Sequence, residues 1–488
     1  MRQRYRVFAL GLILVLLLSI AGCQSSTLQQ EKPQSKVEET DVVVIGAGGA
    51  GLAAAVSAAE NGAKVIVLEK MPMVGGNTIR SGGAYNAVDP ERQKKQGIED
   101  SIEKHFQQTL EGGDYKAKPE LVRVLVENAL DGLHWLESMG MKFKDEVYTV
   151  LGALWPRSHS PADNDAGFSY IETLRKAAEE KGVKILVETK AEELIMENGR
   201  VVGVKATNAE GEELIFKARK GVVLATGGFA ANVEMRMKYN ENLGPEIPTT
   251  NHPGATGDGI VMAEKVGANL IGMEYIQLLP MGDPEDGSLT GWLAPGVEQM
   301  IFVNKEGKRF VAEDARRDVM TNALFKQPDA LMYVISDHKS FPKGKTSFNE
   351  DPNDLIAKGK VIKADTIEEL ARKINVPPEN LKATVEKYNK AVEQNKDEEF
   401  GKKLLGFKID TPPFYASARK PTVHHTMGGV EIDTKARVIG KDGKPIPGLY
   451  AAGEVTGGIH GANRLGGNAL ADVIVFGRIA GESAAKGE

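Results

Sequence analysis

Cysteine is almost absent from this sequence of 488 residues, and its one copy, Cys23, lies near the N-terminus. A single cysteine cannot close a disulfide within the chain or hold an iron–sulfur cluster, and it cannot supply the Cys-x-x-Cys-His motif of a c-type haem. The sequence therefore excludes the cysteine-based redox centres.

The sequence also has no excess of positive charge and no cluster of basic residues of the kind that binds nucleic acids. The chain has 61 Lys and Arg against 67 Asp and Glu, a formal net charge of −6. No basic stretch is interleaved with aromatic residues, so we expect no nucleic-acid partner. The length predicts more than one domain, and the 54 glycines suit a backbone that closely surrounds a ligand.

Long apolar runs are limited to residues 7–20, which follow Arg2, Arg4 and Arg6. This run is short for a membrane span but typical of a signal peptide, and residues 20–23, IAGC, resemble a bacterial lipobox. We expect residues 1–23 to be a lipoprotein signal peptide whose removal shifts the net charge from −6 to −9, since it takes three arginines and no acid. Lipid on Cys23 would then hold the chain outside the cytoplasmic membrane. An uncleaved anchor helix is the alternative.

A dinucleotide-binding pattern is present at residues 41–52, DVVVIGAGGAGL. The β-branched run 42–45 predicts a buried parallel strand, and the alanine-rich stretch 52–60 predicts a helix. Strand, tight turn and helix in this order place the N-terminus of the helix against phosphate groups.

Three glycines and one acid give this pattern its chemistry. Gly46 permits the turn, Gly48 lets a pyrophosphate approach the backbone, and Gly51 lets the helix pack on the sheet. A second predicted strand, 64–68, ends at Glu69, whose carboxylate is placed to accept the ribose hydroxyls of adenosine. Together they predict a bound dinucleotide.

The segments after Glu69 favour FAD over NAD. Residues 70–84, KMPMVGGNTIRSGGA, form a Gly- and Ser-rich loop that resembles the flavin-wrapping segment of the fumarate reductase and succinate dehydrogenase flavoprotein family. Residues 222–228 (VVLATGG) and 452–454 (AGE) are similar to further cofactor-contacting segments of that family. Residues 251–260, 303–310, 424–430 and 448–470 resemble its soluble, flavocytochrome c-type branch.

The resemblance covers nearly all of the chain after residue 40 and implies non-covalently bound FAD, since Asn77 stands near the position of the flavin-linked histidine of succinate dehydrogenase relatives. The positions that it assigns to cofactor binding are Gly46, Gly48, Gly49, Gly51, Glu69, Lys70, Gly76, Asn77, Thr78, Ser81, Gly82, Gly83, Ala225, Thr226, Gly227, Asp258, His425, Gly453, Glu454, Asn468, Ala469 and Leu470.

The implied fold is α/β, a Rossmann-like FAD-binding domain of the glutathione-reductase type with an inserted α+β cap domain. We expect a flexible tether at 24–40, the FAD-binding domain at 41–277 and 415–488, and the cap at 278–414. Within the cap, residues 366–395 have helical spacing that is interrupted at Pro377-Pro378, and the Lys- and Asp-rich stretch 339–363 is expected to be a solvated surface segment.

The resemblance also implies a reaction. Members of the family transfer hydride from flavin N5 to an activated double bond and protonate the adjacent carbon from an arginine, which our alignment of VNKEGKRF places at Arg309. His424 and Arg464 match the family's clamp on the substrate carboxylate, where a guanidinium supplies charge and orientation. His425 is expected to face the flavin or a backbone carbonyl. No third ligand accompanies this His-His pair, so we expect no metal.

Two departures bear on the substrate. Fumarate-reducing relatives bind a second carboxylate through a histidine and a threonine, and relay protons through a glutamate and an arginine. Here Leu279 replaces the histidine, and residues 292–296 read WLAPG in the other segment. A second carboxylate would lie unpaired against Leu279 and Trp292, which is costly.

We therefore expect an extracytoplasmic FAD enzyme that reduces the C=C bond of an α,β-unsaturated monocarboxylate similar to urocanate, acrylate or cinnamate. It would take electrons from a separate donor: a cytochrome, an FMN protein or a quinol-linked protein. Fumarate reduction is the first alternative, aspartate oxidase and ketosteroid dehydrogenase activities are weaker ones, and a flavin-carrying electron-transfer lipoprotein is an alternative of another class.

Overall fold

The dinucleotide pattern forms a parallel βαβ unit in the computed structural model, which describes residues 36–293 and 296–488. β1 (Lys36–Ile45) leads through the glycine turn into α2 (Gly49–Glu60) and then β2 (Val65–Leu68), with Val42 paired to Val65. Gly46 has φ +101°, and a Cβ on Gly51 would lie 1.8 Å from the carbonyl oxygen of Gly46, so the turn and the helix approach each other as closely as glycine allows.

The main sheet has the order β16-β17-β8-β1-β2-β5. Its C-terminal strand β17 is parallel to β8, with Leu449 opposite Val222, so the end of the chain completes the sheet that its beginning starts. The remaining bounds are β5 (Lys184–Leu186), β8 (Glu213–Leu224), β16 (Arg437–Ile439), β17 (Pro445–Ala451), and the hairpin β6 (Lys190–Glu197) and β7 (Arg200–Thr207), which joins the sheet through β8.

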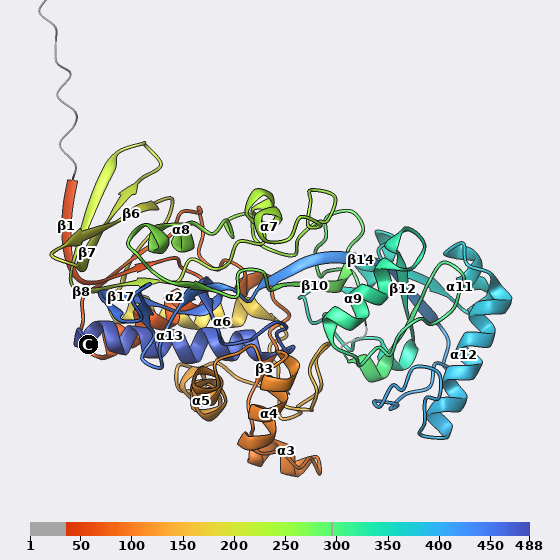
Figure 1. The fold of residues 1–488 in the computed structure, drawn as a ribbon. Helices are drawn as coiled ribbons and strands as arrows, with labels where there is room; N and C mark the ends of the chain where they lie inside the picture. Colours follow the sequence, from red (N-terminus) through yellow and green to blue (C-terminus); the bar gives the residue numbers. More distant parts are fainter. Residues whose placement is uncertain (1–35, 294–295) are drawn as a thin grey trace, which may run out of the picture. The chain divides into compact units, whose positions relative to one another are not determined.

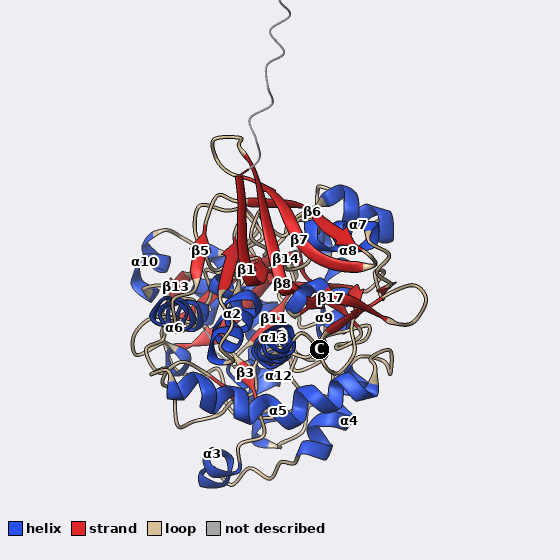
Figure 2. Cartoon of the chain, turned by 90° about the vertical axis from the view of Figure 1, so that its left-hand side faces the viewer, coloured by secondary structure: helices blue, strands red, loops and turns tan. Residues whose placement is uncertain are grey.

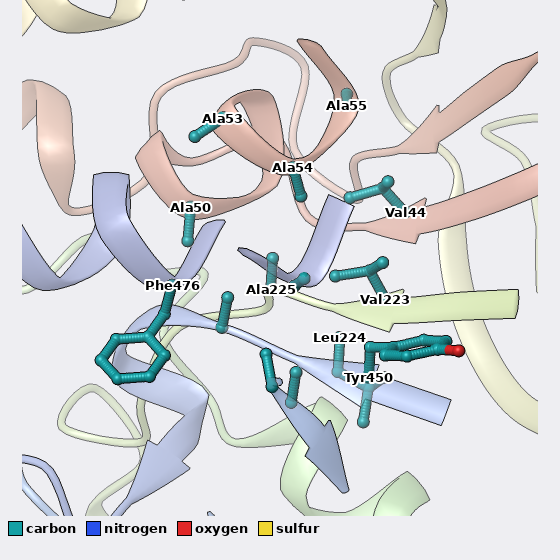
Figure 3. Close-up of a cluster of buried hydrophobic side chains, with 14 of the residues drawn as sticks. Val44, Ala50, Ala53, Ala54, Ala55, Val223, Leu224, Ala225, Tyr450 and Phe476 are labelled. Atoms are coloured by element: carbon teal, nitrogen blue, oxygen red, sulfur yellow. The ribbon is translucent and has the colours of Figure 1, made fainter. Parts of the chain in front are cut away.

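Helix α13 (Asn468–Lys486) packs against α2 beside this sheet, and Figure 2 shows the two helices end-on as neighbours. Small residues allow the close approach, because a Cβ on Gly481 would lie 2.1 Å from the carbonyl oxygen of Ala54. Figure 3 shows the core between helices and strands, where Ala50, Ala53 and Ala54 lie close to Val223, Ala225 and Phe476. Burial of this apolar surface fixes the position of the glycine turn.

The cap has its own sheet, β10 (Ile276–Gly282), β14 (Phe414–Thr426), β12 (Met332–Asp337) and β11 (Ile301–Val303) in that order, with β13 (Ile362–Ala364) also paired to β14. Its helices are α9 (Arg317–Phe325), α10 (Pro352–Ala357), α11 (Ile367–Lys373) and α12 (Pro378–Glu393). The predicted break at Pro377-Pro378 is confirmed, because α12 begins at Pro378. Separate apolar clusters fill this part, and the predicted α/β fold with an α+β cap is confirmed.

Two strands connect the cap to the FAD-binding part, β10 and the long β14 (Figure 1). They pair antiparallel, with Gln277 opposite His425. The boundary expected at residue 415 falls inside β14, whose residues 414–419 still pair with β12 of the cap. The two strands bring β10 side chains of the cap next to the histidine pair.

The other elements surround these two sheets. They are β3 (Tyr85–Asn86), α3 (Pro90–Lys95), α4 (Ile102–Gly112), α5 (Pro119–Ser138), β4 (Ser158–His159), α6 (Gly167–Glu180), α7 (Val233–Tyr239), α8 (Asp258–Lys265), β9 (Leu270–Ile271), β15 (Gly429–Glu431) and β18 (Thr456–Gly457).

The N-terminal predictions are largely outside the described residues, including the signal peptide and Cys23. β1 begins at Lys36, inside the stretch expected to be a flexible tether, because this segment joins the sheet and Glu38 forms a 2.8 Å ion pair with Lys184. Within residues 36–293 and 296–488, no helix combines the length and the apolar character needed to cross a bilayer.

Candidate active site

A cleft of about 860 Å³ lies at the carboxyl ends of the parallel strands of the main sheet. Gly46, Gly48 and Gly49 line it after β1, Glu69 lines it after β2, and residues 225–227 line it after β8. The crevice beyond the carboxyl ends of the strands is where open α/β sheets bind dinucleotides. The predicted glycine turn and acidic residue therefore meet at one cofactor-sized cleft.

Hydrogen bonds fix the acidic end of this cleft. Glu69 Oε2 accepts from the backbone N–H of Ala47 at 2.8 Å, and Oε1 accepts from that of Met71 at 2.9 Å. Lys70 forms a 2.7 Å ion pair with Asp258, and both side chains line the cleft. The carboxylate of Glu69 is thus held in place with lone pairs left for ribose hydroxyls.

A second cavity of about 1190 Å³ adjoins the cleft and shares Asn77, Thr78, Glu454 and Val473 with it. Glu454 accepts from the backbone N–H of Thr426 at 3.0 Å and from the amide of Asn77 at 3.1 Å. Burial raises the pKa of Glu454. A flat ligand that extends from the first cleft would pass these shared residues into the second cavity.

The structure brings most of the predicted cofactor positions to these two spaces. The second cavity is lined by Ser81, Gly82, His425, Ala469 and Leu470, and the first cleft by Gly46, Gly48, Gly49, Glu69, Lys70, Gly76, Asn77, Thr78, Ala225, Thr226, Gly227, Asp258 and Glu454.

Four of the predicted positions line neither space. Gly51 lies where α2 packs on the glycine turn, Gly83 abuts the backbone of Ala166, and Gly453 faces Ala50. The side chain of Asn468 is buried and donates to Thr109 at 3.2 Å. These four positions lie next to residues that line the two spaces, and cofactor contact by them stays a prediction.

His424 lines the second cavity, as expected, on the part of β14 nearest the cofactor cleft. Its Nδ1 lies 2.8 Å from Thr250 Oγ1, which accepts a hydrogen bond from Asn251 Nδ2 at 3.5 Å. When Thr250 donates to Nδ1, the ring carries its proton on Nε2. Burial, with Arg317 and Arg464 adding to it, lowers the pKa of His424 well below its ordinary value. The His424 ring is therefore neutral, and the tautomer with its proton on Nε2 can donate a hydrogen bond into the cavity.

His425 also lines the cavity, and its Nδ1 lies 3.6 Å from Glu454 Oε1. Its ring meets that of His460 edge-on at 5.5 Å between centroids. Within residues 36–293 and 296–488, no group of His, Cys, Asp and Glu side chains is arranged to hold a metal ion. The ring is thus directed to the carboxylate that lies between the two spaces.

Arg464 reaches the second cavity from the glycine-rich C-terminal segment and is only 4% exposed. Its Nη1 donates to the carbonyl of Leu465 at 3.0 Å, and Nε has no hydrogen-bond partner within the described chain. Burial lowers the pKa of Arg464 to about 10, with Glu454 and Asp472 opposing that shift. The side chain is therefore still cationic at neutral pH and can donate further hydrogen bonds.

The expected position of Arg309 in this cavity is wrong. Its Nε and Nη2 each donate to Glu313 at 2.8 Å, and Nη2 also donates to Asp397 at 2.9 Å. Burial alone would lower the pKa of Arg309, but these two carboxylates outweigh it and raise the pKa. Arg309 is not among the residues that line the cavity. Two carboxylates hold its guanidinium in the cap interior, where it has no access to a substrate.

Arg317, at the start of α9, lines the cavity instead and is 6% exposed. Its Nε and Nη2 donate to the carbonyl of Leu151 at 3.1 and 2.9 Å, and Nη1 donates to Gln277 Oε1 at 3.1 Å. No carboxylate is among these partners. Burial, with Arg464 adding to it, lowers the pKa of Arg317 well below its ordinary value.

Helical spacing is the sequence signal that could have shown Arg317 to be buried, although not that it reaches the cavity. Arg317, Met320, Thr321 and Leu324 form the buried face of α9, with intervals of three and four residues. An arginine on the apolar face of a helix is unusual, and it follows a second arginine, Arg316, which pairs with Asp114 and Asp318 near the surface. The motif at residues 303–310 ends before α9 begins, so an alignment of that motif does not include Arg317.

Much of the remaining lining of the second cavity is apolar. Leu279 and Trp292 line the cavity as expected, together with Val150, Met281, Leu289 and Phe348. Tyr148 is the phenol in this lining, and burial raises the pKa of its hydroxyl. The cavity thus combines buried cationic, hydrogen-bonding groups with a large apolar lining.

Comparisons with known proteins agree with this architecture. Residues 41–470 match the FAD binding domain family. The chain is 43% identical to the NADH:acrylate oxidoreductase of Vibrio harveyi over 96% of this chain and 53% of that protein, so it spans about half the length of that relative.

It is 44% identical to the urocanate reductase of Eggerthella lenta over 93% of this chain and 76% of the relative. A solved structure of a flavocytochrome c3 fumarate reductase in its open conformation has a TM-score of 0.72 and 37% identity, covering 92% of this chain and 78% of that one.

Proposed function

We propose that this chain, which belongs to the FAD-binding fumarate reductase family and its flavocytochrome c3-like branch, reduces the C=C bond of an α,β-unsaturated carboxylate. One observation carries the proposal. Arg317 and Arg464 are both buried at one cavity, and within residues 36–293 and 296–488 neither is hydrogen-bonded to a carboxylate. Because burying unpaired cations is costly, such an arrangement is best explained by an anionic ligand that completes it.

The residues of the first cleft fit FAD. The glycine turn leaves room for a pyrophosphate, and Glu69 is positioned for ribose hydroxyls. When bound, FAD supplies the hydride that the reaction requires. We propose that the attachment is non-covalent, because Asn77, whose amide cannot form a flavin bond, lies where the two spaces meet.

The side chains of the second cavity would do the rest of the chemistry. Arg464 and the Nε2–H of His424 bind the carboxylate and stabilise the negative charge that grows on it. Arg317 donates the proton to the carbon next to the one that accepts hydride. Its lowered pKa brings an arginine closer to the range of a useful general acid.

The apolar wall supports a substrate with one carboxylate and an apolar or aromatic far end. Leu279, Trp292 and Phe348 offer no hydrogen bond to a second carboxylate through their side chains, apart from the indole N–H, which donates to the carbonyl of Leu289 at 2.9 Å. Acrylate, urocanate and cinnamate satisfy this description. Electrons would come from a separate donor, and lipid on Cys23 would hold the enzyme outside the cytoplasmic membrane.

Fumarate is the second candidate, and Arg80 favours it. Arg80 lines the same cavity and is exposed, and its Nε donates to the carbonyl of Thr250 at 3.1 Å, so its Nη atoms are available to a second carboxylate. Arg80→Gln would then remove fumarate reduction while leaving acrylate reduction unchanged.

Anaerobic flavin reoxidation tests the proposal. The purified flavoprotein is reduced chemically, mixed with acrylate, urocanate, cinnamate or fumarate, and followed at the flavin absorption maximum. We expect rapid reoxidation by at least one monocarboxylic enoate. Flavin that none of a broad enoate panel reoxidises would instead identify an electron-transfer flavoprotein.

A further inference from the structure

A loop of the cap places an aromatic ring in the cavity wall. Residues 339–363 were expected to be a solvated surface segment, and Lys343 and Lys345 are exposed, but Phe348 is half-buried and lines the second cavity. Thr346 at the base of the loop is 2% exposed. The prediction therefore holds only for part of the segment, because Leu355 and Val361 are also buried and belong to an apolar cluster of the cap.

Two contacts hold the Phe348 ring between the cap and the FAD-binding part. Its centroid lies 6.3 Å from that of Trp292, at an interplanar angle of 47°. The tip of the ring lies close to Gly82, where a Cβ would be only 3.3 Å from Phe348 Cζ. Phe348 therefore contacts both Trp292 of the cap and the flavin-side segment at Gly82.

The backbone behind this ring is firmly held. Thr346 Oγ1 accepts from the backbone N–H of Phe348 at 3.2 Å, and the Thr346 N–H donates to the carbonyl of Glu350 at 2.9 Å. The Glu350 carboxylate accepts from the N–H of Gly291 at 3.0 Å, next to Trp292. Buried Arg419 donates to the carbonyls of Thr290 and Gly291. Both aromatic residues are thus fixed to one hydrogen-bonded frame.

A separate cavity lies beyond the ring. It shares Arg80, Ser81, Thr250, Leu289 and Phe348 with the second cavity. None of Arg317, His424 and Arg464 lines it, whereas Phe168 and Ala166 do. Phe348 is therefore at the boundary between the substrate cavity and an outer space of about 790 Å³, which Arg80 also lines but the proposed clamp on the first carboxylate does not.

We propose that Phe348 is a specificity-determining residue that closes the apolar end of the substrate cavity and limits the length of the substrate's non-carboxylate group. This inference rests on the proposed function. A cinnamate-sized aryl group would pack against Trp292 and Phe348, and a para-substituent would have to occupy the place of the Phe348 ring. Removing the ring joins the two cavities and admits longer aryl enoates.

The test compares wild type, Phe348→Ala and Phe348→Leu, with Phe168→Ala as a matched control because Phe168 lines the outer cavity but not the second cavity and is 44% exposed. Reduction of acrylate, cinnamate and 4-phenylcinnamate is measured. Binding of the saturated analogues of the two aryl acids to the oxidised flavoprotein is measured separately by calorimetry.

For Phe348→Ala we expect kcat/KM to rise at least tenfold for 4-phenylcinnamate and to fall about tenfold for cinnamate. For acrylate, kcat/KM should stay within threefold of the wild-type value. The binding affinities of the two saturated aryl analogues should change in the same directions as the kcat/KM values of the corresponding substrates. Phe348→Leu should give a smaller rise, and Phe168→Ala none. General damage to the fold would lower all three rates together, so a gain for the longest substrate cannot arise from it.

Unchanged or weaker binding of the biphenyl analogue by Phe348→Ala overturns the proposal, as does an equal gain in Phe168→Ala. Failure of the proposed function is a different result: the wild type would bind the aryl acids without reducing any enoate, while the analogue affinities still decide the role of Phe348. A wild type that binds none of these acids overturns both.

Discussion

Gln277 joins the two buried arginines of the cavity: its Oε1 accepts from Arg317 Nη1 at 3.1 Å, and its Nε2 donates to the carbonyl of Arg464 at 2.8 Å. Gln277 lies on β10 and is 3% exposed. One neutral side chain thus fixes the spacing of two cations without cancelling either charge. The predictions below follow from this arrangement and from the residues around it.

Arg317 and Arg309 are expected to behave differently when mutated. Arg317→Ala should lower kcat/KM by about a thousandfold for the best enoate, because the general acid is lost, and the FAD spectrum should persist since Arg317 does not line the first cleft. Stopped-flow reoxidation and absorbance spectra measure the two effects.

Arg309→Ala is the matched control. It leaves Glu313 and Asp397 buried without their guanidinium, which should lower the free energy of unfolding by about 3–5 kcal/mol and reduce the melting temperature. Near-normal turnover by Arg317→Ala, together with loss of chemistry in a stable Arg309→Ala, would restore the role expected from the sequence motif.

Arg464→Ala should impair every enoate alike, because the carboxylate is common to all of them. Fumarate should in addition be at least tenfold poorer in kcat/KM than the best monocarboxylate with the wild type, since one missing charge-assisted contact costs about 2–5 kcal/mol. Leu279→His should narrow this gap. If fumarate is the best substrate of the wild type, Arg80 rather than the apolar wall determines selectivity.

Acid precipitation should release FAD from the protein. Asn77 donates to Glu454 and accepts from the N–H of His252 at 2.7 Å, and it offers no nucleophile to the flavin. The supernatant should therefore carry the yellow colour, measured by its absorbance. Colour that stays with the pellet would show a covalent bond that the proposal does not include.

Cys23→Ala should release the protein from membranes or stop its maturation, because one cysteine carries the proposed lipid. Fractionation and mass spectrometry of the N-terminus measure both effects, with Ser25→Ala as a neighbouring control. Unchanged membrane retention and processing would contradict the proposed anchor.

Stability should fall at acidic pH partly through His105. Burial lowers its pKa from 6.5 to about 3, so the folded chain holds it neutral while the unfolded chain protonates it below pH 6.5. His105 therefore does not lower the free energy of unfolding above pH 6.5. Below pH 6.5 it lowers that free energy by about 1.4 kcal/mol per pH unit as the pH falls towards 3.

His105→Gln should flatten the dependence of melting temperature on pH between 7 and 5, as measured by calorimetry, while keeping a donor for Asn468, whose Oδ1 lies 3.1 Å from His105 Nε2. An unchanged slope would show that other groups dominate the acid response.

The sequence by itself determined the fold and the cofactor cleft. The run at residues 42–45, the glycine turn and Glu69 are local features, and each requires only neighbouring residues to be interpreted. His424, Arg464, Leu279 and Trp292 were also assigned correctly to one cavity, because motifs placed them at strand ends and loops that this fold brings together.

Only the tertiary structure decided which cap arginine reaches that cavity. Arg309 and Arg317 are both cationic, close in sequence and buried, but Asp397 and Glu313 neutralise the first, whereas Leu151 and Gln277 offer the second only carbonyl oxygens. Partners distant in sequence, such as Asp397 and Leu151, make this difference. The contact between Phe348 and Gly82 is likewise made by residues that are far apart in the sequence. Such contacts depend on how the cap packs, which no local pattern encodes.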